Sequence, residues 1–191
     1  MKTVASWGRL SNDLHCVHML NERSHIDRVL AQNQPGLAYG NGRSYGDVCL
    51  NPNGNLWQTT GLNKFIAFDE TSGRLVCEAG VLLRDIQRVF VPRGWMLPVT
   101  PGTQLITVGG AIANDVHGKN HHAAGSFGDH VWALSLVRTS GEKLDLDWDK
   151  TPELMSATVG GMGLTGVIVT AELQLRRVQS PWPVSYTHLR A

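Results

Sequence analysis

Short runs of apolar residues, several alternating with polar ones, recur along the chain in the pattern of β-strands. Segments of this kind are Leu37–Tyr39, Ile66–Asp69, Arg74–Ala79, Val131–Arg138, Lys143–Leu146 and Val167–Leu175. The turn residues Thr71-Ser72-Gly73 and Ser140-Gly141 each separate two neighbouring segments, which predicts two β-hairpins. The apolar run Leu14–Leu20 fits either a strand or a helix.

Helical spacing of apolar residues appears in other segments. Leu82–Val91 carries them three and four positions apart, and Pro92 and Gly94 follow as terminators. His25–Gln34 predicts a second short helix, which ends before Pro35. Pro152–Ala157 predicts a third, with Thr151 as its N-cap. The mixture indicates an α+β fold without a repeated βαβ unit or an internal repeat.

Composition narrows the possible classes of protein. With 191 residues, 42% hydrophobic and 17% charged, the chain is long enough for one sizeable core or two small subdomains. A net charge of +1 gives no field that attracts nucleic acid, so no nucleic-acid partner is expected. Three separated cysteines suggest neither a disulfide framework nor a zinc site.

Targeting features are also missing from the sequence. The first ten residues have no signal-peptide pattern, and no apolar run approaches the roughly 18 residues of a membrane span. We therefore expect a cytoplasmic protein or one that lies peripherally at a membrane face.

The 21 glycines gather in clusters, which is typical of backbone that adopts unusual dihedral angles or approaches a ligand closely. The first cluster is Gly40–Asp47. A glycine loop that leaves a strand can turn several N–H groups inward and bind a pyrophosphate. Ser44 adds a hydroxyl group and Arg43 a positive charge. An ordinary tight turn is the alternative interpretation of this cluster.

The second cluster combines Pro101-Gly102-Thr103 with Thr107–Ala113, and a polar run up to His122 follows it. Small residues in series allow a flat ring or a phosphate to approach the backbone. The third cluster, Gly160–Gly166, contains a GxGxxG pattern. A Rossmann site needs this pattern between a strand and a helix. Here a helix is predicted before it and a strand after it, so we reject the Rossmann interpretation.

Three histidines, His117, His121 and His122, raise the alternative of a metal-dependent hydrolase. His121 and His122 are adjacent, and on a strand they would point to opposite faces. The sequence contains no HExxH motif. We therefore predict no metal site.

Taken together, these stretches resemble the FAD-binding domain of the vanillyl-alcohol oxidase/p-cresol methylhydroxylase superfamily. The segment from Pro101 to His130 is the most specific part, and Gly42–Asp47 and Gly160–Gly166 agree with it. The resemblance covers about residues 7–178 and implies two α+β subdomains with FAD between them. The cofactor-binding residues that it implies are Gly40, Asn41, Gly42, Arg43, Ser44, Tyr45, Gly46, Asp47, Gly102, Thr103, Thr107, Val108, Gly109, Gly110, His117, Gly118, Lys119, Asn120, Gly166 and Val167.

The resemblance also implies a chemistry. Many members attach FAD covalently through a histidine of the first loop, but Tyr45 stands at that position here, which implies noncovalent FAD. Lys119 and His117 are the candidate catalytic residues. The similarity is strongest to members that oxidise the 2′-hydroxyl of a polyprenylphosphoryl sugar for cell-wall synthesis, with a partner keto-reductase. A sugar-lactone or alditol oxidase is the alternative, although those members usually carry the covalent histidine.

The resemblance further suggests how the chain is divided. Residues 1–178 are expected to form the FAD-binding domain, and residues 179–191 a linker and a non-native tail. Members of the superfamily have a C-terminal substrate domain, which is expected to be missing here because the sequence ends where that domain should begin. We therefore expect the chain alone to be inactive, and a flavin-binding module without turnover is a further alternative.

Overall fold

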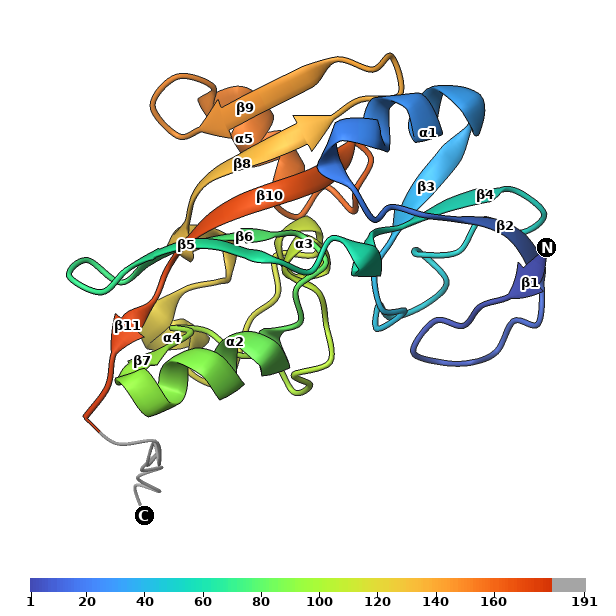
Figure 1. Ribbon diagram of the computed structural model, residues 1–191. Helices are drawn as coiled ribbons and strands as arrows, with labels where there is room; N and C mark the ends of the chain where they lie inside the picture. Colours follow the sequence, from blue (N-terminus) through green and yellow to red (C-terminus); the bar gives the residue numbers. More distant parts are fainter. Residues whose placement is uncertain (180–191) are drawn as a thin grey trace.

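The computed structural model describes residues 1–179 and confirms the predicted α+β class, with the strands divided between two main sheets (Figure 1). The first sheet has the order β1-β2-β4-β3, in which β2, β4 and β3 are parallel and β1 is antiparallel to β2. Its strands are β1 (Lys2–Thr3), β2 (Leu14–Met19), β3 (Gly36–Tyr39) and β4 (Asn55–Gln58).

The second sheet is antiparallel and has the order β5-β6-β10-β8-β9. Its strands are β5 (Phe65–Asp69), β6 (Arg74–Glu78), β8 (Val131–Val137), β9 (Lys143–Asp147) and β10 (Val167–Gln174). A separate short ribbon pairs β7 (Trp95–Met96) with β11 (Arg176–Arg177). Both predicted hairpins, β5–β6 and β8–β9, are therefore confirmed.

The helices are short. The α-helices are α1 (Ile26–Gln32), α2 (Leu83–Phe90), α3 (Val108–Ala113), α4 (His121–Ala124) and α5 (Pro152–Thr158). The 3-10 turns are η1 (Arg23–His25), η2 (Thr59–Gly61), η3 (Val91–Arg93) and η4 (Gly128–His130). The three predicted helices correspond to α1, α2 and α5, and Gly94 ends η3 in the left-handed conformation, with φ 81°.

Some local features differ from the sequence-based expectations. The ambiguous run at Leu14–Leu20 is strand β2, because it pairs with β4 in the parallel sheet. Neither β4 nor α3 was predicted. Thr151 stands at the N-cap position of α5 but does not cap it with its side chain. Its hydroxyl instead accepts from the Asp147 N–H and donates to the Asp147 carbonyl, so it stabilises the preceding turn.

The two sheets are joined by an apolar interface. Leu20, Ile26 and Leu30, on and beside α1, belong to one buried cluster with Val137 and Val169 of the second sheet. An ion pair between half-exposed Arg23 and buried Glu78 adds to this contact. Glu78 of β6, 1% exposed, accepts from the Lys64 N–H at 2.9 Å and lies 3.1 Å from Arg23 Nε. The two halves therefore share a core.

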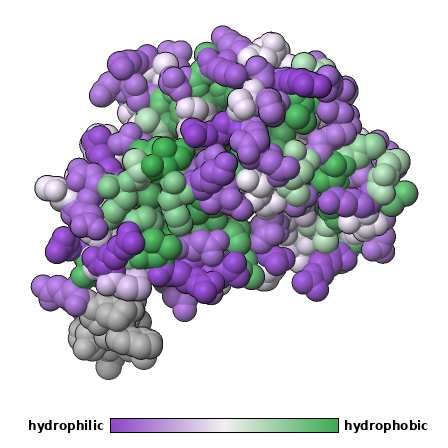
Figure 2. Space-filling model, viewed as in Figure 1, coloured by the Kyte–Doolittle hydropathy of each residue, from purple (hydrophilic) through white to green (hydrophobic). Residues whose placement is uncertain are grey.

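The visible face of the molecule is mainly hydrophilic, with hydrophobic areas between the charged residues (Figure 2). Phe65 and Ile66 of the edge strand β5 are among the exposed hydrophobic residues. Among the helices of residues 1–179, none is long and apolar enough to cross a membrane. The predicted domain, residues 1–178, lies within the described part. Of the predicted tail, residues 180–191 lie outside the described residues.

Candidate cofactor-binding site

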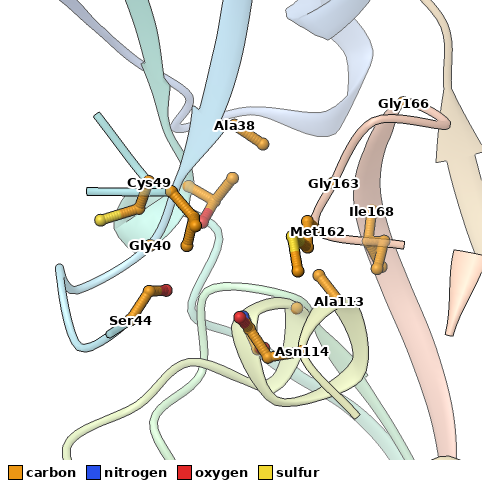
Figure 3. Close-up of a pocket in the computed structure, with 14 residues that line it drawn as sticks. Ala38, Gly40, Ser44, Cys49, Ala113, Asn114, Met162, Gly163, Gly166 and Ile168 are labelled. Carbon is orange, nitrogen blue, oxygen red and sulfur yellow. The ribbon is translucent and has the colours of Figure 1, made fainter. Parts of the chain in front are cut away.

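A groove of about 790 Å³ lies between the loop that follows β3 and the segment that joins β7 to α4. A smaller hollow of about 60 Å³ continues from it toward Gly166. Figure 3 shows this hollow with Ser44 and Cys49 on one side, Met162 and Ile168 on the other, and Asn114 below. The groove therefore brings together all three glycine clusters, which are far apart in the sequence.

The first cluster forms one wall of the groove, from Gly40 to Tyr45. Within residues 1–179, no backbone acceptor is paired with the N–H groups of Asn41, Gly42 and Arg43. The Asn41 side chain donates to the Leu105 carbonyl at 2.7 Å and so ties this loop to the second cluster. The first loop thus has backbone donors available for a ligand, as a phosphate-binding nest requires.

Arg43 adds charge to this wall. Its Nε is buried and has no hydrogen-bond partner within the described part of the chain. Buried polar atoms are normally paired, so an unpaired guanidinium nitrogen beside a groove is consistent with a ligand that completes it. The observation favours an anionic group at this end.

The second cluster is different, because protein atoms already accept from the first N–H groups of α3. Val108 N–H donates to the Val81 carbonyl at 2.8 Å, and Gly109 N–H donates to the Ala79 carbonyl at 2.7 Å. Gly110 N–H donates to the Thr107 hydroxyl, which caps the helix at 3.1 Å. This cluster therefore supplies a floor made of small residues rather than a set of free donors.

Two glycines of the second cluster leave real space in the groove. A Cβ built on Gly102 would meet no atom within 4 Å, and one on Gly110 would meet only the Thr107 hydroxyl at 3.0 Å. By contrast, a Cβ on Gly118 would lie 2.5 Å from the Thr100 carbonyl oxygen. Gly102 and Gly110 thus allow close approach of a ligand, whereas Gly118 allows the chain to pack.

The polar run forms the far end of the groove. His117, Lys119 and His121 line it, and the His117 and His121 rings meet edge to face with centroids 5.6 Å apart. Asn120 faces elsewhere, since its side-chain amide donates to the Pro98 carbonyl at 2.9 Å. Of the described carboxylates, none lies within salt-bridge distance of Lys119. Lys119 is therefore available to an anionic or hydroxyl-bearing ligand.

His121 and His122 lie on helix α4 and not on a strand, so the expectation that they point to opposite faces of a strand is wrong. Within residues 1–179, no group of three metal-ligating side chains is arranged to hold a metal ion. His121 instead contacts the Gly118 carbonyl at 3.2 Å through a ring nitrogen.

The third cluster connects α5 to β10, so a helix precedes it and a strand follows, as predicted. Its backbone docks on α3: Gly160 N–H donates to the Ile112 carbonyl, and Met162 N–H donates to the Ala113 carbonyl. Met162 lines both the groove and the hollow, and Gly166 lines the hollow. The Rossmann interpretation is therefore excluded by the order of these elements.

Several predicted residues lie beside the groove rather than on its surface. Val108 and Val167 are buried in the hydrophobic cores. Gly46 and Asp47 are not among the residues that line the groove, and Asp47 accepts from the Ser6 hydroxyl at 2.7 Å. Conversely, the groove is also lined by residues that were not predicted to bind the cofactor, several of them within the predicted clusters. They are Trp7, Val48, Cys49, Pro101, Ile106, Asn114, Val116, His121 and Met162.

Burial keeps two groups near the first loop neutral. It raises the pKa of the Cys49 thiol, although hydrogen bonds from Ser44 act in the opposite direction. It also raises the pKa of Tyr39, whose hydroxyl donates to the Ala5 carbonyl at 2.9 Å. The described residues that line the groove include Arg43, Lys119, two histidines and the protonated thiol of Cys49, and no carboxylate.

A large groove with backbone N–H groups that no described acceptor uses, and with the buried and unpaired Nε of Arg43, suits a large anionic cofactor. The chain belongs to the family described as FAD binding domain, which matches residues 23–147. Decaprenylphosphoryl-beta-D-ribose oxidase of Mycolicibacterium smegmatis is 37% identical to it, over 95% of this chain and 41% of the relative.

Other relatives have different substrates in their names. L-gulonolactone oxidase of Mus musculus is 28% identical over 75% of this chain and 32% of its own length. D-lactate dehydrogenase of Anaerostipes hadrus is 30% identical over 67% of this chain and 28% of its own length. The chain thus spans less than half the length of each of these relatives, and the resemblance to FAD-dependent oxidoreductases found in the sequence is confirmed.

Proposed function

We propose that this chain is the FAD-binding part of an oxidase that converts the 2′-hydroxyl of a polyprenylphosphoryl ribose to a ketone. The observation that carries the proposal is the continuous groove, which joins the free N–H groups of the first loop to the Lys119 end. The 37% identity to decaprenylphosphoryl-beta-D-ribose oxidase over 95% of the chain supports the choice of substrate. The activity proposed is that of the whole protein.

The residues of the groove fit FAD. The N–H groups of Asn41, Gly42 and Arg43, with the Arg43 guanidinium group, would bind the pyrophosphate. The open space at Gly102 and Gly110 would admit a flat ring system against the floor formed by α3. We propose that the cofactor is held noncovalently, because Tyr45 has no nucleophilic nitrogen. When bound, FAD supplies a hydride acceptor, and the protein orients the substrate against it.

His117 and Lys119 would act at the substrate end. Lys119 would donate to an oxygen of the substrate and place the carbon that loses the hydride. His117 would hydrogen-bond the reacting hydroxyl and accept its proton. We further propose a partner keto-reductase that consumes the ketone, in cell-wall synthesis, and peripheral attachment to a membrane that carries the lipid-linked sugar.

A second candidate is oxidation of a sugar lactone or alditol, favoured by the 28% identity to L-gulonolactone oxidase. The two candidates differ in substrate charge, since a polyprenylphosphoryl sugar is anionic and a lactone is neutral. The Lys119 end, where no described carboxylate forms an ion pair, favours the anionic substrate.

The first experiment adds FAD to the purified chain, removes free flavin, and records the visible spectrum before and after acid precipitation. Flavin that stays with the folded chain and appears in the acid supernatant is the expected result. Flavin in the precipitate would contradict noncovalent binding, and a folded chain without flavin would contradict the site.

The substrate proposal is tested on the whole protein with a panel of polyprenylphosphoryl ribose, a lactone and an alditol. We expect Lys119→Met to reduce kcat/KM about 100-fold, the loss of roughly 2.7 kcal/mol from the transition state. The control is Lys150→Met, since the Lys150 side chain is exposed beyond the groove, beside Asp147. Preferential turnover of the lactone would overturn the proposed substrate.

A further inference from the structure

The N-terminal segment Ala5–Trp7 lies against the first glycine loop, although more than thirty positions separate them in the sequence. Trp7 N–H donates to the Ser44 carbonyl at 3.2 Å. The Ser6 hydroxyl donates to Asp47 at 2.7 Å, and the Ala5 carbonyl accepts from the Tyr39 hydroxyl. The segment thus contacts strand β3, the middle of the loop and the end of the loop.

Close packing makes these contacts specific. Ser6 is 2% exposed, although serine is usually a surface residue. A Cβ built on Gly42 would lie 2.2 Å from the Ala5 carbonyl oxygen, so the backbone of the segment occupies the place of a side chain. The conformation of the loop is therefore determined partly by a segment that lies before the matched family region, which begins at residue 23.

An aromatic pair extends the segment to the groove itself. The Trp7 and Tyr45 rings meet edge to face, with centroids 6.4 Å apart and an interplanar angle of 88°. Both residues line the groove, and they remain 49% and 80% exposed. Because the pair lies at the groove, a ligand bound there would cover part of both rings.

We propose that Ala5–Trp7 form part of the cofactor site, with Ser6 as a positioning residue and Trp7 as its outer wall. This inference rests on the proposed FAD site. A loop rich in glycine loses much conformational entropy when it becomes ordered, so an unrestrained loop would bind FAD weakly. The segment orders the loop in advance and keeps the N–H groups of Asn41–Arg43 directed at the ligand.

The Ser6–Asp47 contact is tested by FAD titration of the whole 191-residue chain. We expect Ser6→Ala to weaken FAD binding about tenfold, or roughly 1.4 kcal/mol. Asp47→Ala, which removes the acceptor, should weaken it as well, and the double variant should bind no more weakly than the weaker-binding single variant, because both substitutions remove the same contact. Ser11→Ala is the matched control, since Ser11 donates to Asp13 outside the loop and should leave affinity unchanged.

Trp7 is tested with a spectroscopic readout that a purely structural role would not change. The fluorescence of Trp7, obtained as the difference between wild type and Trp7→Phe, should be strongly quenched when FAD binds. Trp7→Ala should weaken binding, and Trp7→Phe should restore most of it, because an aromatic edge is kept. Because the Trp7 side chain is half exposed, these variants are expected to fold, which thermal unfolding would check.

The outcomes separate this inference from the proposed function. If wild type binds FAD, and Ser6→Ala and Trp7→Ala bind it equally well, the inference is wrong and the FAD site stands. Additive effects of Ser6→Ala and Asp47→Ala, or an unquenched Trp7, would also overturn it. If folded wild type binds no FAD, both proposals fail.

Discussion

The first and second glycine clusters line the same groove but use glycine for opposite purposes. In the first, no acceptor among residues 1–179 is bonded to the backbone N–H groups of Asn41–Arg43, and positive φ angles at Gly42 and Gly46 shape the loop. In the second, the N–H groups of Val108, Gly109 and Gly110 are already bonded within the protein. A run of small residues therefore does not by itself identify a set of backbone donors.

The difference follows from what surrounds each cluster. Gly109 lies against Ala79, where an added Cβ would be 3.1 Å from the alanine Cβ, so its glycine serves close packing of α3 on the sheet. The first loop extends beyond β3 and packs mainly on the N-terminal segment. One cluster provides hydrogen-bond donors and the other a rigid apolar floor.

The largest effect is expected for Gly42→Ala. The left-handed conformation, φ 60°, costs an alanine about 1–2 kcal/mol, and the added Cβ would also collide with the Ala5 carbonyl. We expect FAD affinity to fall by at least about 30-fold, roughly 2 kcal/mol. Gly46→Ala is the matched control, since it has the same sign of φ, 58°, but meets no atom within 4 Å. Equal losses from both variants, measured by FAD titration, would contradict the collision.

Gly102→Ala should lower FAD affinity without lowering the stability of the fold. Its added Cβ meets no protein atom within 4 Å and needs no left-handed backbone, so the midpoint of thermal unfolding should not change. FAD affinity should fall about tenfold, near 1.4 kcal/mol, because the methyl group occupies ligand space. Unchanged affinity would show that the cofactor does not pass Gly102.

Thr107→Val should lower the stability of the fold and leave FAD affinity largely unchanged. It removes the hydroxyl that caps α3, and loss of such a cap costs about 1 kcal/mol of the free energy of unfolding. Thr107→Ser keeps the hydroxyl and should retain most of that stability. The measurement is denaturant unfolding without FAD. A large loss of FAD affinity with unchanged stability would instead assign this hydroxyl to the ligand.

The smallest effect concerns thiol reactivity. Burial raises the pKa of Cys49, and it raises that of Cys77 to about 12, so both thiols remain protonated at neutral pH. Since the thiolate is the reactive form, alkylation should accelerate only as the pH rises above the ordinary thiol range. FAD should slow the alkylation of Cys49, which lines the groove, and leave Cys77 unaffected. Mass spectrometry of alkylated peptides would measure both rates.

Much of the second sheet could be predicted from the sequence, because its hairpins alternate clearly and carry glycine turns. The helix α3 could not, since Val108–Ala113 are mostly small residues without amphipathic spacing, and only the cap residue Thr107 marks its start. Strand β4 is only four residues long, and it is a strand because it pairs with β2 and β3. Short elements defined by tertiary pairing leave little local signal.

In the candidate site, too, some residues could be predicted from the sequence and others could not. Glycine, arginine and lysine positions could be proposed from their chemistry, whereas Trp7 lines the groove only because a distant segment folds against it. Asp47 was predicted to bind the cofactor, and in the structure its side chain accepts from the Ser6 hydroxyl. Residues that support a loop from a distance carry no pattern of their own.

The shared core beneath the groove has a consequence for its dimensions. One wall follows β3 and the other begins near α3, so the separation between them depends on how tightly α1 packs over Val137 and Val169 and on the Arg23–Glu78 ion pair. Protein cores resist compression and are not continuously deformable. The width of the groove is thus set by packing in the core. A substitution that leaves a cavity around Leu30 would alter how a ligand fits, although Leu30 does not line the groove.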